Sequence, residues 1–156
     1  MTLVKRILNH PPESPALHVR GQLFNYGMLG GFSRQLAAMI ASELTGSHQS
    51  VAILASRSLT AYGGVLAALV AGCGYIPLNP RFPAERTRLM LAASSSRVLI
   101  VGDEALEVLS TLLETVSDPL LVLLPQTEVI DDLCENYPKH RFLGLSQIAA
   151  AEPADP

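Results

Sequence analysis

The sequence predicts an α/β fold, with a mainly parallel sheet flanked by helices. Two observations support the parallel sheet. Short apolar runs without charge recur along the chain, as is typical of strands that are covered on both faces. These runs alternate with helical patterns, and that alternation requires crossover connections between parallel strands. A chain of 156 residues is also long enough to bury a sizeable core.

The N-terminal region has a different pattern. Three prolines in residues 9–15 exclude a helix or a central strand there, so we expect residues 1–15 to be a leader. Residues 16–19 and 22–26 are predicted to be two short strands joined by a tight turn. Residues 28–44 carry apolar side chains at helical, one-sided spacing, which predicts an amphipathic helix.

The alternating part follows a polar loop at residues 45–50. Ser58 and Asp103 are predicted helix caps, Pro83 suits a first helical turn, and Gly72 suits a helix stop. The predicted strands are 50–55, 74–78, 97–101 and 119–124, and the predicted helices are 59–71, 83–93 and 103–115. Residues 131–135 are expected to form a helical turn, 141–145 a short strand, and 149–156 a linker without a packing pattern. Residues 16–148 are therefore predicted to form one unit.

Composition limits the function classes. Charged residues make up 16% of the chain, against about 25% in a typical soluble domain, so the chain is either a compact domain with a buried sheet or a piece whose neighbour covers an apolar face. The net charge is −3 and the eleven basic residues are scattered, so we expect no nucleic-acid or membrane partner. Glycines and prolines interrupt the least charged stretch, 59–80, and no signal peptide is indicated. We expect a cytoplasmic protein.

No motif for catalysis or metal binding is found. Gly27, Gly30 and Gly31 lie between a strand and a helix, but their spacing is not that of a phosphate loop, and a tight turn is the better interpretation. The four histidines stand alone, the two lysines are at 5 and 139, and Cys73 lies far from Cys134. Asp131 and Asp132 point about 100° apart on a helix, so they form no acid–base couple. We therefore predict no catalytic, cofactor-binding or metal-binding residue in this chain.

Residues 69–86 carry a more specific sequence pattern than the rest of the chain. Residues 69–86, LVAGCGYIPLNPRFPAER, describe a helix end, a glycine stop, a buried strand, a proline-bounded loop and a new helix. The residue types along this stretch all suit that order of elements. Helix 59–71 before it carries no charge, which predicts burial on every side. Glu85 suits the helix start, and Arg86 could pair back toward the loop.

This stretch resembles an early core motif of amino-acid adenylation domains, LKAGxAYVPLDPxxPxER, from non-ribosomal peptide synthetases. Tyr26 and Leu29 resemble the family's first motif, with Asn25 in place of its hydroxyl residue. Further similarity lies at VAIL, RSL and SSRVL, and the resemblance covers residues 17–101. Asn79 stands where the family has Asp, which keeps the turn and removes a charge. The motif positions in this chain are Tyr26, Leu29, Gly72, Tyr75, Pro77, Asn79, Pro80, Pro83, Glu85 and Arg86, of which Asn79 is the departure.

The resemblance implies that the chain is the N-terminal part of the large subdomain of an adenylate-forming enzyme. It also implies a two-step reaction. ATP and an amino acid, with Mg²⁺, form an aminoacyl-adenylate, and the acyl group then passes to the phosphopantetheine thiol of a carrier protein. The family's phosphate loop would follow after this chain, so we expect no bound cofactor for the chain alone and expect the remainder of the adenylation domain as its partner.

Two alternatives to such a piece of an adenylating enzyme stay open. One is a natural non-catalytic remnant or split subunit that acts as an interaction partner. The other is an unrelated small α/β nucleotide-binding domain.

Overall fold

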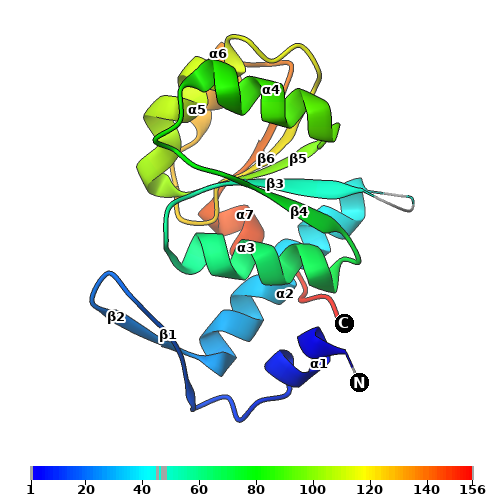
Figure 1. The fold of residues 1–156 in the computed structure, drawn as a ribbon, viewed down its shortest axis with the longest axis vertical. Coiled ribbons are helices and arrows are strands. Elements are labelled where there is room, and N and C mark those ends of the chain that lie inside the picture. Colours follow the sequence, from blue (N-terminus) through cyan, green and yellow to red (C-terminus); the bar gives the residue numbers. More distant parts are fainter. Residues whose placement is uncertain (1, 45, 47–48, 156) are drawn as a thin grey trace.

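A parallel sheet forms the centre of the molecule in the computed structural model, which describes residues 2–44, 46 and 49–155 (Figure 1). Its strand order is β4-β3-β5-β6-β7, and every pairing is parallel. The strands are β3 (Ser50–Leu54), β4 (Gly74–Leu78), β5 (Val98–Val101), β6 (Leu121–Leu123) and β7 (Arg141–Leu143). The predicted α/β fold is thus confirmed, including all four predicted central strands. Thr45, Ser47 and His48 of the predicted loop lie outside the described residues.

Helices cover both faces of this sheet (Figure 1). The helices are α1 (Leu3–Leu8), α2 (Tyr26–Glu43), α3 (Leu59–Val70), α4 (Ala84–Ser94), α5 (Leu106–Leu113), α6 (Asp131–Asn136) and α7 (Leu145–Ala149). Side chains of β3 alternate between two cores: Val51 and Ile53 pack with α2, α3 and α7, whereas Ala52 and Leu54 pack with α4 and α5. This alternation explains why the strand is an unbroken apolar run. None of the described helices has the length and apolarity that a bilayer crossing requires.

A separate hairpin precedes the first long helix. It pairs β1 (Pro15–Val19) with β2 (Gln22–Asn25) in antiparallel fashion. The two turn residues, Arg20 and Gly21, have φ values of 51° and 75°, which is the left-handed geometry of the tightest hairpins. The predicted strands and turn are therefore present.

The predicted leader has structure of its own. Helix α1 was not expected, because the prolines that follow it dominate the local pattern. It packs on α2, where Leu8 approaches Gly30. Backbone hydrogen bonds from Tyr26 and Gly27 to the carbonyls of Ser14 and Pro12 fix the connection. A boundary between leader and domain at residue 15 stays a prediction.

Several local predictions are wrong in detail. Pro83 occupies the cap position before α4 rather than its first turn. Asp103 does not cap a long helix, because residues 103–105 form a 3₁₀ turn and α5 begins only at Leu106. Residues 145–149 form α7, and the backbone N–H of Ala154 donates to the carbonyl of Arg34, so the tail does have a packing pattern. Its role as a linker stays a prediction.

Helix α3 is also not buried on every side. Its glycine-rich face packs on α2 and the sheet, but Tyr62 and Leu69 on the outer face are each 40% exposed. Tyr75 on β4, a strand that α3 contacts, is 44% exposed. The outer face of α3, which carries no charged residue, therefore lies beside β4, the outermost of the described strands of the sheet.

His140, which immediately precedes β7, is buried. Its Nδ1 accepts a hydrogen bond of 3.1 Å from the backbone N–H of Leu120, next to the β6–β7 pairing. Burial, assisted by the neighbouring Lys139 ammonium, lowers the pKa of His140 below its usual value. Lys139 itself donates to the carbonyl of Val116. Both residues thus have structural contacts that their sequence context did not predict.

Candidate functional site

The 69–86 stretch runs from the end of α3 along the edge strand β4 into α4. Gly72 has a φ of 73°, and the N–H groups of Gly72 and Cys73 close the helix on the carbonyls of Leu69 and Ala68. This is a Schellman motif, in which glycine avoids the penalty of the left-handed conformation. Pro77 lies in the edge strand, where its missing N–H breaks no sheet pairing.

The loop after β4 is held by local contacts. The Asn79 side-chain oxygen accepts from the Arg81 N–H at 2.9 Å, so an amide here does maintain the turn. The Arg86 guanidinium lies 3.9 Å from the centre of the Phe82 ring, which is the contact back to the loop that we expected. Glu85 in the first turn pairs with Arg88, and this pairing lowers the pKa of Glu85. These residues shape the backbone, and their functional assignment as a family motif stays a prediction.

Replacing Gly72 by Val should destabilise the chain by about 1–3 kcal/mol, because a β-branched residue is strained at positive φ. Open space surrounds the position, so the cost comes from the backbone and not from a clash. Thermal unfolding measures the effect. Gly74→Val is the matched control: Gly74 has ordinary strand geometry and room for a side chain, so its midpoint should hardly change. An unchanged midpoint in Gly72→Val would contradict the assignment.

The first motif begins α2. The Asn25 side chain accepts from the Met28 N–H at 2.8 Å and caps the helix, which is the role a hydroxyl residue would also serve. Tyr26 stacks on His10 with ring centroids 4.1 Å apart, and Leu29 is buried. The motif therefore anchors the N-terminal segment to the helix start.

The sheet has a topological switch point between β3 and β5. The crossover through α3 leads from β3 outward to β4, whereas the crossover through α5 leads from β5 to β6 on the other side. Ligands of open α/β sheets bind at the carboxyl ends of the strands beside such a point. We therefore take this carboxyl edge as the candidate functional site.

Polar side chains of three segments meet at the carboxyl edge. Ser58 caps α3 by accepting from the Ala61 N–H at 3.1 Å. Thr60, fully buried, donates to the side-chain oxygen of Gln126 at 2.6 Å. Glu104 accepts a hydrogen bond from the backbone N–H of Ser56 at 2.5 Å. These bonds tie together the loops that follow β3, β5 and β6.

The hairpin faces this edge across a groove of about 250 Å³. The groove is lined by Val19, Arg20, Gln22 and Phe24 of the hairpin and by Ser58, Leu59, Asp103 and Gln126 of the edge. Arg20 lies 3.5 Å from the carboxylate of Glu104. Neither Arg20 nor Glu104 was predicted as a site residue, although a hairpin turn and the loop after a strand are places where site residues commonly occur.

The residues that line this groove offer no free cation to the phosphates of ATP. Asp103 lines the groove, and Arg20, the cation among the lining residues, pairs with Glu104. Arg57, on the loop after β3, is exposed. Gly27, Gly30 and Gly31 do not form the predicted tight turn, because all three lie inside α2. In the part of the chain that the structure describes, no three His, Cys, Asp or Glu side chains gather to hold a metal ion.

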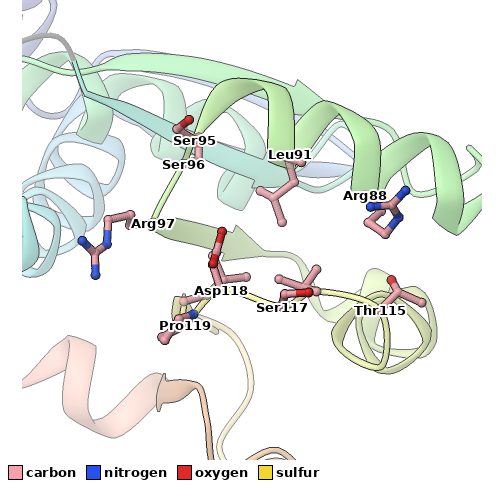
Figure 2. Close-up of a pocket in the computed structure, with 12 residues that line it drawn as sticks. Arg88, Leu91, Ser95, Ser96, Arg97, Thr115, Ser117, Asp118 and Pro119 are labelled. Atoms are coloured by element: carbon pink, nitrogen blue, oxygen red, sulfur yellow. The ribbon is translucent and has the colours of Figure 1, made fainter.

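A larger cavity, of about 470 Å³, lies at the opposite, amino end of the sheet (Figure 2). Leu91 of α4 points into it, and residues 115–120 form the facing wall (Figure 2). Arg88 on its rim is engaged by Glu85. The cavity lies away from the switch point, so its volume alone does not make it the candidate site.

Comparison with known proteins identifies the family. The profile of the family described as "AMP-binding enzyme" matches residues 4–154, nearly the whole chain. The chain belongs to this family. Relatives in Bacillus subtilis (strain 168) include surfactin synthase subunit 3, 33% identical over 66% of the chain, and a dimodular nonribosomal peptide synthase, 35% identical over 60%. The chain spans only 8% and 4% of these two relatives.

Solved structures show the same fold. The Vibrio cholerae adenylation domain AlmE, in complex with glycyl-adenosine-5′-phosphate, superposes with a TM-score of 0.80 and 30% identity. The match covers 90% of this chain and 26% of that one. IdnL7 has a TM-score of 0.77 and 32% identity over 97% of this chain and 29% of its own. The predicted resemblance to the N-terminal portion of adenylation domains is confirmed.

Proposed function

We propose that this chain forms the sheet-building first part of an amino-acid-activating enzyme that uses ATP and Mg²⁺ and loads a carrier-protein thiol. The main support is the 0.80 TM-score and 30% identity to an adenylation domain bound to glycyl-adenosine-5′-phosphate. The peptide synthases among the relatives support the amino-acid substrate class and a role in secondary metabolism. The proposed location is the cytoplasm, with no nucleic-acid or membrane partner.

The proposal assigns phosphate binding and catalysis to residues outside these 156. Its basis is the groove at the carboxyl edge, whose lining residues include the carboxylate of Asp103 and one arginine, Arg20, already paired with Glu104, so they offer no free cation to a triphosphate. The partner of the chain is then the remainder of an adenylation domain. The uncharged surface of Tyr62, Leu69 and Tyr75 is one face that this remainder could cover.

The isolated chain should not catalyse ATP–pyrophosphate exchange. With Mg²⁺ and a panel of amino acids, the exchange rate should equal that of a control without protein. When a B. subtilis surfactin synthase adenylation domain that lacks its corresponding first segment is added, exchange should appear. Exchange by the isolated chain would contradict the assignment of catalysis to other residues. Background exchange in the mixture, with both proteins shown to associate, would favour the non-catalytic interaction partner.

A further inference from the structure

The carboxylate of Glu104 joins three segments that are far apart in the sequence. It accepts the backbone N–H of Ser56 at 2.5 Å, and its Oε1 lies 3.5 Å from the Arg20 guanidinium at the hairpin tip. Glu104 itself follows β5 in the 3₁₀ turn. Although the residue as a whole is exposed, only 21% of its side-chain surface is accessible. The side chain thus folds back against the sheet edge instead of extending into solvent.

The chain provides space for this folded-back side chain at Gly102. A Cβ at that position would lie 2.5 Å from one carboxylate oxygen of Glu104 and 2.8 Å from the other. Gly102 has no left-handed φ, so its backbone does not require glycine. Glycine at position 102 therefore leaves room for the Glu104 carboxylate to lie against the sheet edge.

The charge of Glu104 also fits its contacts. Burial by itself would raise the pKa of Glu104, but the hydrogen bond from the Ser56 N–H and the Arg20 guanidinium lower it below its usual value. A lowered pKa means that the bound carboxylate stabilises this arrangement above the pKa of the unfolded chain. That contribution is lost as the pH falls through the lower, folded value.

We propose that Glu104 is a positioning residue that clamps the β1–β2 hairpin and the loop after β3 to the carboxyl edge, with Gly102 providing the space for its carboxylate. The hairpin needs such an anchor, because a two-stranded hairpin alone is marginally stable. The clamp sets the width of the groove at the switch point. Its effect on catalysis rests on the proposed function, whereas the clamp itself can be tested in the chain alone.

Hydrogen exchange of backbone amides tests the clamp. In Glu104→Gln, the amides of Ser56 and of the hairpin should exchange about tenfold faster, since the neutral amide side chain loses the ion pair and binds the Ser56 N–H more weakly. Gly102→Ala should have the same local effect while the charge stays. Glu107→Gln removes a charge three residues away, on an exposed side chain, and should change neither set of amides.

Two further readouts separate a clamp from general destabilisation. Arg20→Gln should accelerate exchange in the hairpin but leave the Ser56 amide protected. In the unmodified chain, Ser56 protection, corrected for intrinsic rates, should fall as the pH drops through the lowered pKa of Glu104, and this step should be absent in Glu104→Gln. Exchange in Glu104→Gln equal to that in Glu107→Gln would overturn the proposal.

The catalytic part is tested in an adenylation domain that carries these residues in place of its own first segment. Glu104→Gln should lower kcat/KM for pyrophosphate exchange about tenfold, and Glu107→Gln should not. Unchanged kcat/KM would limit the clamp to the hairpin and overturn its role in positioning the proposed site. A domain that is inactive before any substitution would count against the proposed function, while the exchange data on the chain would still decide the clamp.

Discussion

Gly63→Ala should destabilise the chain by about 1–3 kcal/mol, in the range for overpacking a tight contact. Gly63 lies where α3 crosses α2, and a Cβ there would overlap the Phe32 ring, with its Cε1 only 2.6 Å away. The ring is half-buried between the two helices, so it cannot move aside without opening their contact. Chemical denaturation of the chain measures the change in free energy of unfolding.

Gly31→Ala is the matched control for this prediction. Gly31 lies in α2 and is exposed, and a Cβ at this position would have no neighbouring atom within 4 Å. The same substitution should therefore stabilise by up to about 1 kcal/mol, because alanine favours the helix. Opposite signs for the two variants support close packing of α2 on α3. Equal effects at both positions would contradict it.

The central sheet was predictable because its signal is local. Strands β3 and β5 are buried on both faces, so each appears as an uninterrupted apolar run whose ends agree with the structure to within one residue. Ser58 was identifiable as a cap because a hydroxyl precedes an apolar helix, and it does cap α3. Gly72 was identifiable from its place between a helix and a strand, and it has positive φ.

Other features depend on contacts between distant segments. Helix α1 has six residues, too few to be stable by itself, so it depends on packing against α2. The local sequence pattern does not predict that packing. Glu104 and Ser56 are 48 residues apart, so their hydrogen bond follows from the topology and not from a motif. Asp103 is a residue type that often caps helices, but residues 103–105 form a 3₁₀ turn, and α5 begins at Leu106.

The proposed role is tested most directly by a chimera. The adenylation domain of a solved relative, such as V. cholerae AlmE, would carry residues 4–154 of this chain in place of its own matching segment. We expect ATP–pyrophosphate exchange at least 100-fold above background, because the interchanged part builds the sheet and the catalytic groups stay with the host. The preferred amino acid should be that of the host.

The exchange rate and the amino-acid preference of the chimera test two separate claims. A folded, monodisperse chimera whose exchange rate stays at background would contradict the claim that this chain is the sheet-building part of an amino-acid-activating enzyme. A changed amino-acid preference would contradict the claim that the substrate pocket lies outside these residues. Exchange above background with the host's preference retained is the result that the account predicts.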